Sequence, residues 1–296
     1  MKFLHKFKAI LILGRISNLP TVWSNCLAAY ILSEGGFSGT VEIKKFILLN
    51  LGATFLYLGG MFLNDSFDAN FDRKYRLDRP IPSGIVSLNL VVFLGTVFML
   101  IGLFCVIWIN TFALVFVLCL AVSIVWYNYV HKDITWSPLI MGLCRLFLYL
   151  LAGAISFNSV DISVLIGGVI LWGYIVGLSN IAKYEVTGGR INSWPCWFLF
   201  LPIVYTFILL IFFSLDFSVS LGLIFSLIIY LFWILRSLLY SFNSKSPNYG
   251  KTVSGLLAGI VLFDLVLITL NGSQFFIIFI LFFALSLLFQ RYIPAT

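Results

Sequence analysis

The chain has 296 residues, of which 61% are hydrophobic and only 10% are charged. A soluble domain usually carries about 25% charged residues, so this composition excludes an ordinary soluble protein. The formal net charge is +7, but a chain with so few charged residues offers no soluble domain with a groove for nucleic acid. We therefore expect a membrane protein and no nucleic-acid partner.

Long apolar runs predict the elements of the fold. A helix needs about 20 apolar residues to cross a bilayer. Runs near this length lie at 16–33, 46–64, 88–109, 111–130, 137–156, 163–182, 196–214, 218–240, 253–271 and 274–290. Some gaps between them are short, so the predicted count is nine or ten spans. No linker or charge tract divides them, which predicts one all-α integral-membrane domain over residues 1–296, a polytopic transmembrane helical bundle.

Basic residues are distributed unequally between the two sides of this bundle. Of the 18 Lys and Arg residues, fifteen lie on the N-terminal side if there are ten spans, Lys44 and Lys45 lie on the opposite side, and Arg145 lies within a span. Loops rich in Lys and Arg stay in the cytoplasm. We therefore expect a multi-pass protein of the cell inner membrane, with the N-terminus and the loops near residues 73, 132, 185 and 245 in the cytoplasm. Anionic membrane lipids are expected partners of these loops.

A cluster of carboxylates marks the end of the second span. Asp65, Asp68 and Asp72 fall within about 60° of one another on a helix with 100° per residue, and Asn64 lies beside them. Hard oxygen ligands of this kind suit Mg²⁺, which is usually held by a few carboxylates together with substrate phosphate oxygens. Basic residues follow directly at Arg73, Lys74, Arg76 and Arg79. Carboxylates for a metal beside cations for phosphate predict a diphosphate site, and the alternative is a solvated loop with salt bridges.

Two further clusters lie on the same predicted side. The sixth span ends in Asn180, Lys183 and Glu185, of which Asn180 and Lys183 share a helical stripe while Glu185 points away on a regular helix. The loop after the fourth span contributes Tyr127, His131, Lys132 and Asp133. These loops are expected to converge with the carboxylate cluster on one polar cavity that opens to the cytoplasm.

Two charged residues lie near the middle of predicted spans, whereas Arg236 lies near the end of its span. Arg145 is expected to face the bundle interior or an aqueous cavity, because an arginine in contact with lipid is costly. Asp264 is an isolated carboxylate in the ninth span. We expect it to form hydrogen bonds with a neighbouring helix, with proton transport as the alternative.

The carboxylate stretch also resembles a known family. "NDSFDANFD" at 64–72 and "RPIPSG" at 79–84 are similar to the NDxxDxxxD and RPxPSG motifs of the UbiA superfamily of intramembrane prenyltransferases. The resemblance implies a helical bundle around a central cavity in which Mg²⁺ holds a prenyl diphosphate. It makes Asn64, Asp68 and Asp72 the metal ligands, with Asp65 beside them, and Arg79 a diphosphate contact. "YNYVHK" partly matches the YxxxKR pattern of the family, with His131 in place of the lysine. This match adds Tyr127 and Lys132 to the expected diphosphate contacts.

The second metal motif of the family is altered in this chain. Where the family has two carboxylates four residues apart, Glu185 remains and Gly189 stands in place of the next Asp. We expect Lys183 to contact the diphosphate in place of a second ion, so that one Mg²⁺ is bound tightly and a second weakly or not at all. These departures are most similar to a divergent branch associated with the Ebo gene cluster.

The resemblance implies a Mg²⁺-dependent membrane prenyltransferase that moves an isoprenyl group from a prenyl diphosphate to a lipophilic or small acceptor. Asp68, Asp72 and Lys183 are the expected catalytic residues. The expected diphosphate contacts are Arg79, Lys132, Tyr127, Arg145, Lys183 and Asn180, and the expected metal ligands are Asn64, Asp65, Asp68, Asp72 and Glu185. The alternative is a catalytically altered UbiA-fold protein that binds or transports a prenyl lipid or a pathway precursor.

Overall fold

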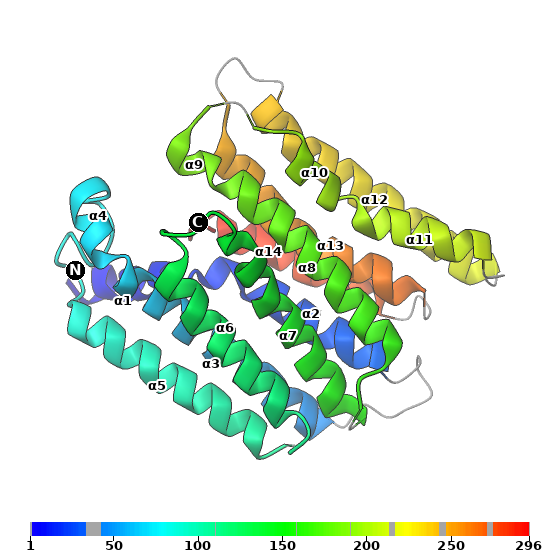
Figure 1. The fold of residues 1–296 in the computed structure, drawn as a ribbon, viewed down its shortest axis with the longest axis horizontal. Coiled ribbons are helices and arrows are strands. Elements are labelled where there is room, and N and C mark those ends of the chain that lie inside the picture. The colour runs from blue at the N-terminus through cyan, green and yellow to red at the C-terminus, as the bar shows by residue number, and fades with distance from the viewer. Residues whose placement is uncertain are drawn as a thin grey trace.

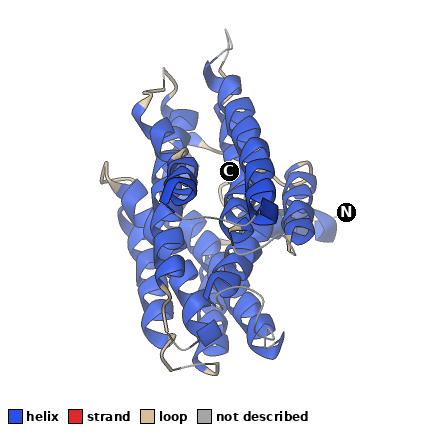
Figure 2. Ribbon diagram, turned by 90° about the vertical axis from the view of Figure 1, so that its right-hand side faces the viewer, coloured by secondary structure: helices blue, strands red, loops and turns tan. Residues whose placement is uncertain are grey.

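The structure is a computed structural model that describes residues 2–33, 43–109, 111–157, 159–189, 191–212, 217–242, 247–270 and 275–295. These segments contain helices and loops and no strand (Figure 2). The predicted all-α fold is therefore confirmed. The expectations that concern Arg190 and Lys245 lie outside the described residues.

The helices follow the predicted spans closely. In chain order they are α1 (Lys2–Leu13), the 3-10 helix η1 (Ile16–Asn18), α2 (Leu19–Ser33), α3 (Ile43–Phe67), α4 (Ala69–Tyr75), α5 (Leu88–Ile107), α6 (Leu114–Val130), α7 (Ser137–Phe157), α8 (Ile162–Ala182), α9 (Tyr184–Thr187), α10 (Trp194–Phe198), α11 (Leu201–Phe212), α12 (Phe217–Phe242), α13 (Tyr249–Thr269) and α14 (Phe276–Gln290). Within the described segments, six helices (α3, α5, α7, α8, α12 and α13) are long and apolar enough to cross a membrane, whereas α6, α11 and α14 are apolar but shorter. The chain is thus built as a multi-pass membrane protein, and the count of nine or ten spans stays a prediction.

The helices pack mainly against their neighbours in sequence. α3 lies along α5, α7 along α8, and α12 along α13. α5 forms one edge of the bundle and α11 with α12 the opposite edge (Figure 1). The close approach of α3 to α5 requires glycine, because a Cβ atom on Gly59 would lie 2.8 Å from the carbonyl oxygen of Gly95.

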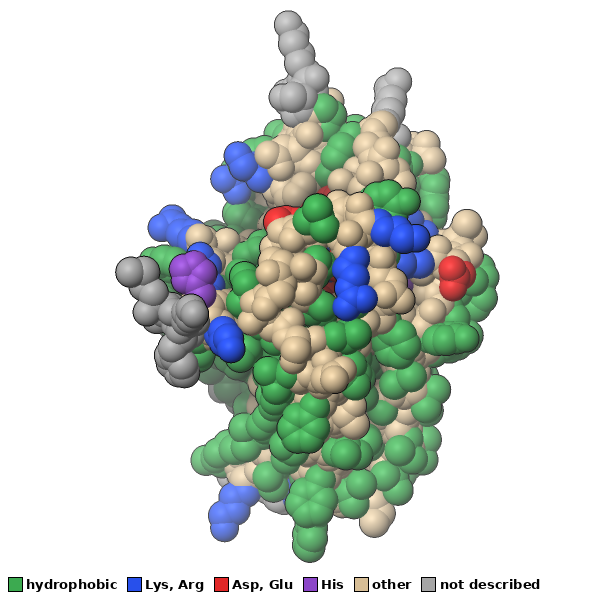
Figure 3. Space-filling view, turned by 90° about the vertical axis from the view of Figure 1, so that its left-hand side faces the viewer, with side chains coloured by type: hydrophobic (Ala, Val, Ile, Leu, Met, Phe, Trp, Pro, Cys, Tyr) green, Lys and Arg blue, Asp and Glu red, His purple; other side chains and the backbone are tan. Residues whose placement is uncertain are grey.

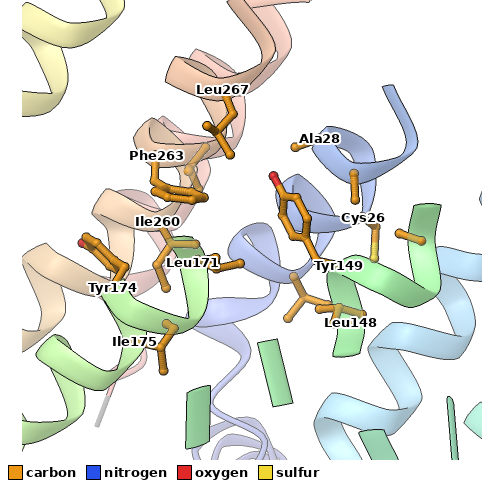
Figure 4. Close-up of a cluster of buried hydrophobic side chains, with 14 of the residues drawn as sticks. Cys26, Ala28, Leu148, Tyr149, Leu171, Tyr174, Ile175, Ile260, Phe263 and Leu267 are labelled. Carbon is orange, nitrogen blue, oxygen red and sulfur yellow. The ribbon is translucent and has the colours of Figure 1, made fainter. Parts of the chain in front are cut away.

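The centre of the bundle is formed by α2, α7, α8 and α13. Almost every residue of α2 is buried, and 83% of the apolar part of α13 is buried inside the protein. Side chains from all four helices meet there, among them Cys26 of α2, Tyr149 of α7, Leu171 of α8 and Phe263 of α13 (Figure 4). Because α2 and α13 are enclosed by the rest of the bundle, they have no lipid-facing side. Polar side chains on these two helices can be satisfied only by other protein groups or by an internal cavity.

The polar loops gather at one end of the bundle. α1, α4, α9 and both ends of the described chain lie toward the same side of the molecule (Figure 1). Viewed from that side, Lys and Arg side chains surround a region that contains acidic side chains (Figure 3). This convergence was predicted from the loop positions. The cytoplasmic assignment of this end remains a prediction from the distribution of basic residues.

That assignment can be tested by labelling single cysteines in a variant without the five native ones. Lys74 and Lys44 are both exposed side chains, and we expect them on opposite sides of the membrane. A membrane-impermeant maleimide added to intact cells should label Lys44→Cys and not Lys74→Cys, and it should label both after the membrane is opened. The reverse pattern in intact cells would refute the proposed orientation.

Candidate active site

A cavity of about 710 Å³ opens at the polar end of the bundle and extends between its central helices. Its outer part is lined by charged and amide side chains, namely Arg15, Asn18, Asn64, Asp68, Arg76, Asp78, Arg79, Asn128, His131, Lys132, Lys183 and Glu185. Its inner part is lined by apolar side chains such as Val22, Ala53, Leu56, Leu120, Ile124 and Leu148. The cavity therefore suits an amphipathic ligand with an ionic head and an apolar chain.

The carboxylate cluster is assembled at the junction of α3 and α4. Asp65 is in the last turn of α3, Asp68 lies between the two helices, and Asp72 is in α4. The amide of Asp68 donates to the carbonyl of Asn64 (3.0 Å) and that of Asp72 to the carbonyl of Asp68 (2.9 Å), so the helical path continues across the junction. The three carboxylates are only 6%, 7% and 2% exposed in chain order. The predicted stripe of Asp residues thus faces the protein interior.

Two arginines approach this stripe from different parts of the chain. Arg79 lies 3.2 Å from an oxygen of Asp65 and 3.3 Å from an oxygen of Asp72. Arg15, between α1 and α2, lies 3.4 Å from Asp65 and 3.4 Å from the amide oxygen of Asn64. Arg79 is thus in the cluster, its predicted contact with diphosphate stays a prediction, and Arg15 is a site residue that no sequence motif indicated.

The loop after α6 supplies further cations. Lys132 lies 2.5 Å from an oxygen of Asp68, and its ammonium also sits 4.0 Å from the centre of the Phe71 ring. His131 lies 3.2 Å from the same Asp68 oxygen and is stacked on Tyr127. The expected convergence of this loop with the carboxylate cluster is therefore present, and it brings His131 as well as Lys132 to Asp68.

Asn64 is oriented by an amide that the sequence did not single out. Its NH₂ group donates to the side-chain oxygen of Asn128 (3.1 Å), and Asn128 donates in turn to the carbonyl of Gly60 (3.0 Å). This arrangement directs the Asn64 oxygen toward Arg15. An amide oxygen held in this way is a suitable additional ligand beside carboxylates.

The ion pairs determine the protonation of the groups outside the spans. Burial acts to raise the pKa of Asp68, but its contacts with His131 and Lys132 outweigh burial and hold the pKa below the usual aspartate value. Burial acts to lower the pKa of Arg15, but Asp65 and other nearby groups outweigh it, and the pKa is raised. Asp68 is therefore ionised at neutral pH, and Arg15 is positively charged.

The second predicted cluster is only partly directed into the cavity. Lys183 and Glu185 line the cavity, and the ammonium of Lys183 donates to the carbonyl of Thr135 (2.6 Å). Asn180 is not among the cavity-lining residues, because its amide donates to the carbonyl of Val176 on the same helix (2.9 Å). α8 ends at Ala182 and the short helix α9 begins at Tyr184, with Lys183 between them in the right-handed helical conformation. Diphosphate contact by Asn180 stays a prediction.

Arg145 and Asp264 are both satisfied by contacts with other helices. Arg145 lines the cavity and donates to the side-chain oxygen of Asn25 (2.7 Å), as expected for an arginine that faces the interior. Asp264 accepts a hydrogen bond from Ser24 (2.6 Å), among others. The expectation that Asp264 bonds a neighbouring helix is confirmed.

The carboxylate cluster has the donor chemistry of a magnesium site. Within the described segments, no three Asp, Glu, His or Cys side chains are arranged as a ready metal-binding group. One oxygen of Asp72 is nevertheless buried and has no hydrogen-bond partner in the described part of the chain. A buried carboxylate oxygen without a partner is costly, and a divalent cation would satisfy it. Hard oxygens from Asn64, Asp65, Asp68 and Asp72 therefore fit Mg²⁺.

These features define an integral membrane protein with a polar cavity for a substrate that combines an anionic head with an apolar chain. The sequence model of the UbiA prenyltransferase family matches residues 20–294. The chain belongs to the UbiA prenyltransferase family.

Individual relatives agree with this membership. Digeranylgeranylglyceryl phosphate synthase from Saccharolobus solfataricus is 29% identical over 120 residues, which are 40% of this chain and 42% of the relative. The synthase of the same name from Methanocaldococcus jannaschii is 29% identical over 110 residues, which are 37% of this chain and 38% of the relative. The chain thus spans about two fifths of the length of the curated relatives it matches.

Solved structures show the same fold. A digeranylgeranylglyceryl phosphate synthase structure has a TM-score of 0.58 at 22% identity, over 90% of this chain and 97% of that one. A UbiA homologue from Archaeoglobus fulgidus bound to DMAPP and Mg²⁺ has a TM-score of 0.60 at 15% identity, over 96% of this chain and 99% of that one. At these identities the likeness shows the fold.

The pairing of Arg79 with two buried carboxylates leads to a stability prediction. Arg79→Gln leaves Asp65 and Asp72 without this cation, and removal of one partner of a buried ion pair costs about 3 kcal/mol or more. We expect a clear loss of thermal stability in detergent without metal, and partial recovery when Mg²⁺ replaces the lost positive charge. Arg73→Gln is the matched control, because Arg73 is exposed. Equal stability of the two variants would contradict the prediction.

Proposed function

We propose that this protein is a Mg²⁺-dependent membrane prenyltransferase that moves an isoprenyl group from a prenyl diphosphate to a lipophilic acceptor. The observation that carries the proposal is the cavity, whose wall combines the buried carboxylate of Asp68 and the cations Arg15, Arg79 and Lys132 with apolar side chains. Membership of the UbiA family supports it. The similarity to digeranylgeranylglyceryl phosphate synthases favours an acceptor that carries a glyceryl phosphate.

Asn64, Asp65, Asp68 and Asp72 would hold the metal ion. When bound, Mg²⁺ supplies neutralisation of the diphosphate charge as the carbon–oxygen bond weakens. Lys132 and Arg79 lie directly beside these carboxylates and are placed to bind the diphosphate oxygens. Such contacts strengthen as negative charge develops on the leaving group, so they stabilise the transition state more than the ground state.

The remaining parts of the cavity take the other substrate groups. Tyr127 stacks on His131 at the cavity wall and would bound the diphosphate pocket. The apolar inner wall would hold the isoprenyl chain and exclude water from the reacting carbon. The acceptor would then lie near the boundary between the ionic and apolar parts, where its nucleophile could approach the first carbon of the chain.

The proposal is tested with purified protein, labelled prenyl diphosphates of 10 to 20 carbons, Mg²⁺ or EDTA, and a membrane extract supplemented with a glyceryl phosphate lipid. We expect labelled product and released diphosphate only with Mg²⁺. Asp68→Asn and Asp72→Asn should reduce the rate at least about 100-fold, because each removes a charged ligand. Asp133→Asn, an exposed residue outside the cavity lining, should retain activity.

The same experiment separates the two functional hypotheses. Prenyl diphosphate binding that depends on Mg²⁺ and is never followed by product, at any chain length, would refute the enzymatic proposal. It would favour the alternative in which the protein binds or transports a prenyl lipid or a pathway precursor.

The altered second motif leads to a prediction about metal number. We propose one tight Mg²⁺ at Asp68 and Asp72, with Lys183 as a direct diphosphate contact. Glu185→Gln should then change the rate by less than about tenfold, whereas Asp68→Asn should nearly abolish it. Activity as a function of Mg²⁺ concentration is the measurement, and an equally large loss in both variants would show that Glu185 holds a second required ion.

A further inference from the structure

Asp264 lies in the centre of the bundle, away from the carboxylate cluster at the cavity mouth. Its side chain is completely buried. One of its oxygens accepts from Ser24 (2.6 Å) and from the Asn25 amide (2.7 Å), and the other accepts from Tyr149 (3.0 Å). Tyr149 projects from α7 into the space between α2 and α13 (Figure 4). A carboxylate at this depth is costly to maintain, and such residues usually serve a function in membrane proteins.

Asn25 connects this carboxylate to the cavity wall. Its amide nitrogen donates to Asp264 (2.7 Å) while its amide oxygen accepts from the guanidinium of Arg145 (2.7 Å). A guanidinium has donors only. If the amide of Asn25 were rotated by 180°, its NH₂ group would face an N–H group of Arg145, and its oxygen would face a carboxylate oxygen of Asp264. The orientation of Asn25 that Arg145 requires is therefore the one that Asp264 enforces.

Arg145 is held firmly and still presents free donors. It also donates to the carbonyl of Thr21 (3.3 Å) and to the Thr21 hydroxyl (2.9 Å). That hydroxyl donates to the carbonyl of Asn18 (2.7 Å), so its oxygen is available as an acceptor. These three contacts use both terminal nitrogens of the five-donor guanidinium and leave N–H groups over.

The positive charge of Arg145 is compensated by a carboxylate that it does not contact directly. Among the ion pairs of the described residues none includes Arg145, whereas Arg15 and Arg79 contact carboxylates directly. Asp264 is separated from it by one neutral amide. A direct carboxylate partner would occupy the fork of the guanidinium, which is the geometry that binds anions. The intervening amide keeps the counter-charge near Arg145, which lines the cavity and retains N–H groups that these three contacts do not use.

We propose that Asp264 is a positioning residue that acts through Asn25 and holds Arg145 as a second anion-binding point of the cavity. Arg145 follows Ser137, another cavity-lining residue, by eight positions on α7 and so lies about 12 Å further along the helix. The bound group is a phosphate or carboxylate of a substrate, either the diphosphate of the prenyl donor or the anionic head of the acceptor. This inference rests on the proposed function for the identity of the substrates.

We call the hydrogen-bonded series Asp264–Asn25–Arg145 the relay, and it is tested by moving the carboxylate from position 264 to position 25. In the double variant Asn25→Asp/Asp264→Asn the amide and the acid exchange places, so the total charge is kept while a carboxylate contacts Arg145 directly. If Asp264 only stabilises the fold, this exchange should leave substrate binding unchanged. We expect instead that KM for one substrate rises about tenfold or more, with kcat within about twofold, because the guanidinium fork is neutralised.

Asp264→Asn alone should raise the same KM, because the counter-charge that orders Asn25 is lost. Tyr149→Phe is the matched control, since Tyr149 contacts the other oxygen of Asp264 and does not line the cavity. It should leave both KM values within about twofold of the unmodified protein. The KM that changes, for geranylgeranyl diphosphate or for a glyceryl phosphate lipid, identifies which anion Arg145 binds.

Ligand binding is measured in parallel, so that a failure of the proposed prenyltransferase function can be distinguished from a failure of the relay. Dissociation constants for inorganic pyrophosphate and for glycerol phosphate are determined on each folded variant, with folding verified by thermal unfolding in detergent. Absence of turnover in the unmodified protein would defeat the proposed function, while a weakened affinity in the exchanged variant would still support the relay. Unchanged affinities in both Asp264 variants, or an equal loss in Tyr149→Phe, would overturn the relay.

Discussion

The pairing of buried charges is the constraint on which the rest of this structure depends. A helical bundle in lipid has no water to solvate an isolated ion, so each carboxylate needs a cation or several donors. At the cavity mouth this need brings Arg15, Arg79 and Lys132 against the Asp residues of α3 and α4. These contacts join the start of the chain, the segment after α4 and the loop after α6, and they thereby define the shape of the site.

Much of the fold and part of the site follow from the sequence. The apolar runs place the helices, because a segment long enough to cross the membrane has little choice but to be helical. Helical periodicity groups Asp65, Asp68 and Asp72 correctly, since the helical path continues over the roughly two turns that carry them. Arg145 and Asp264 are predictable as interior residues because exposure of either to lipid is too costly.

Other site residues depend on contacts that no local pattern encodes. Arg15 meets Asp65 across 50 positions, and Asn64 meets Asn128 across 64, so neither pairing has a sequence period. Asn25 is a neutral residue inside an apolar run, where an amide gives no signal of the two charges it connects. Asn180 lies on the expected stripe, but its amide donates to the carbonyl of Val176 on its own helix, a contact that periodicity does not reveal.

The cation partners of the carboxylates also have a consequence for the order of ligand binding. Three carboxylates face three Lys and Arg groups, so the cluster is close to electrically balanced. A divalent cation alone would leave this buried region with excess positive charge, and a diphosphate alone would leave it with excess negative charge. In the proposed site the two ligands together would nearly restore the balance, with the metal on the carboxylates and the displaced cations on the diphosphate. Metal and diphosphate should therefore bind with strong positive cooperativity, each raising the affinity for the other by the same factor.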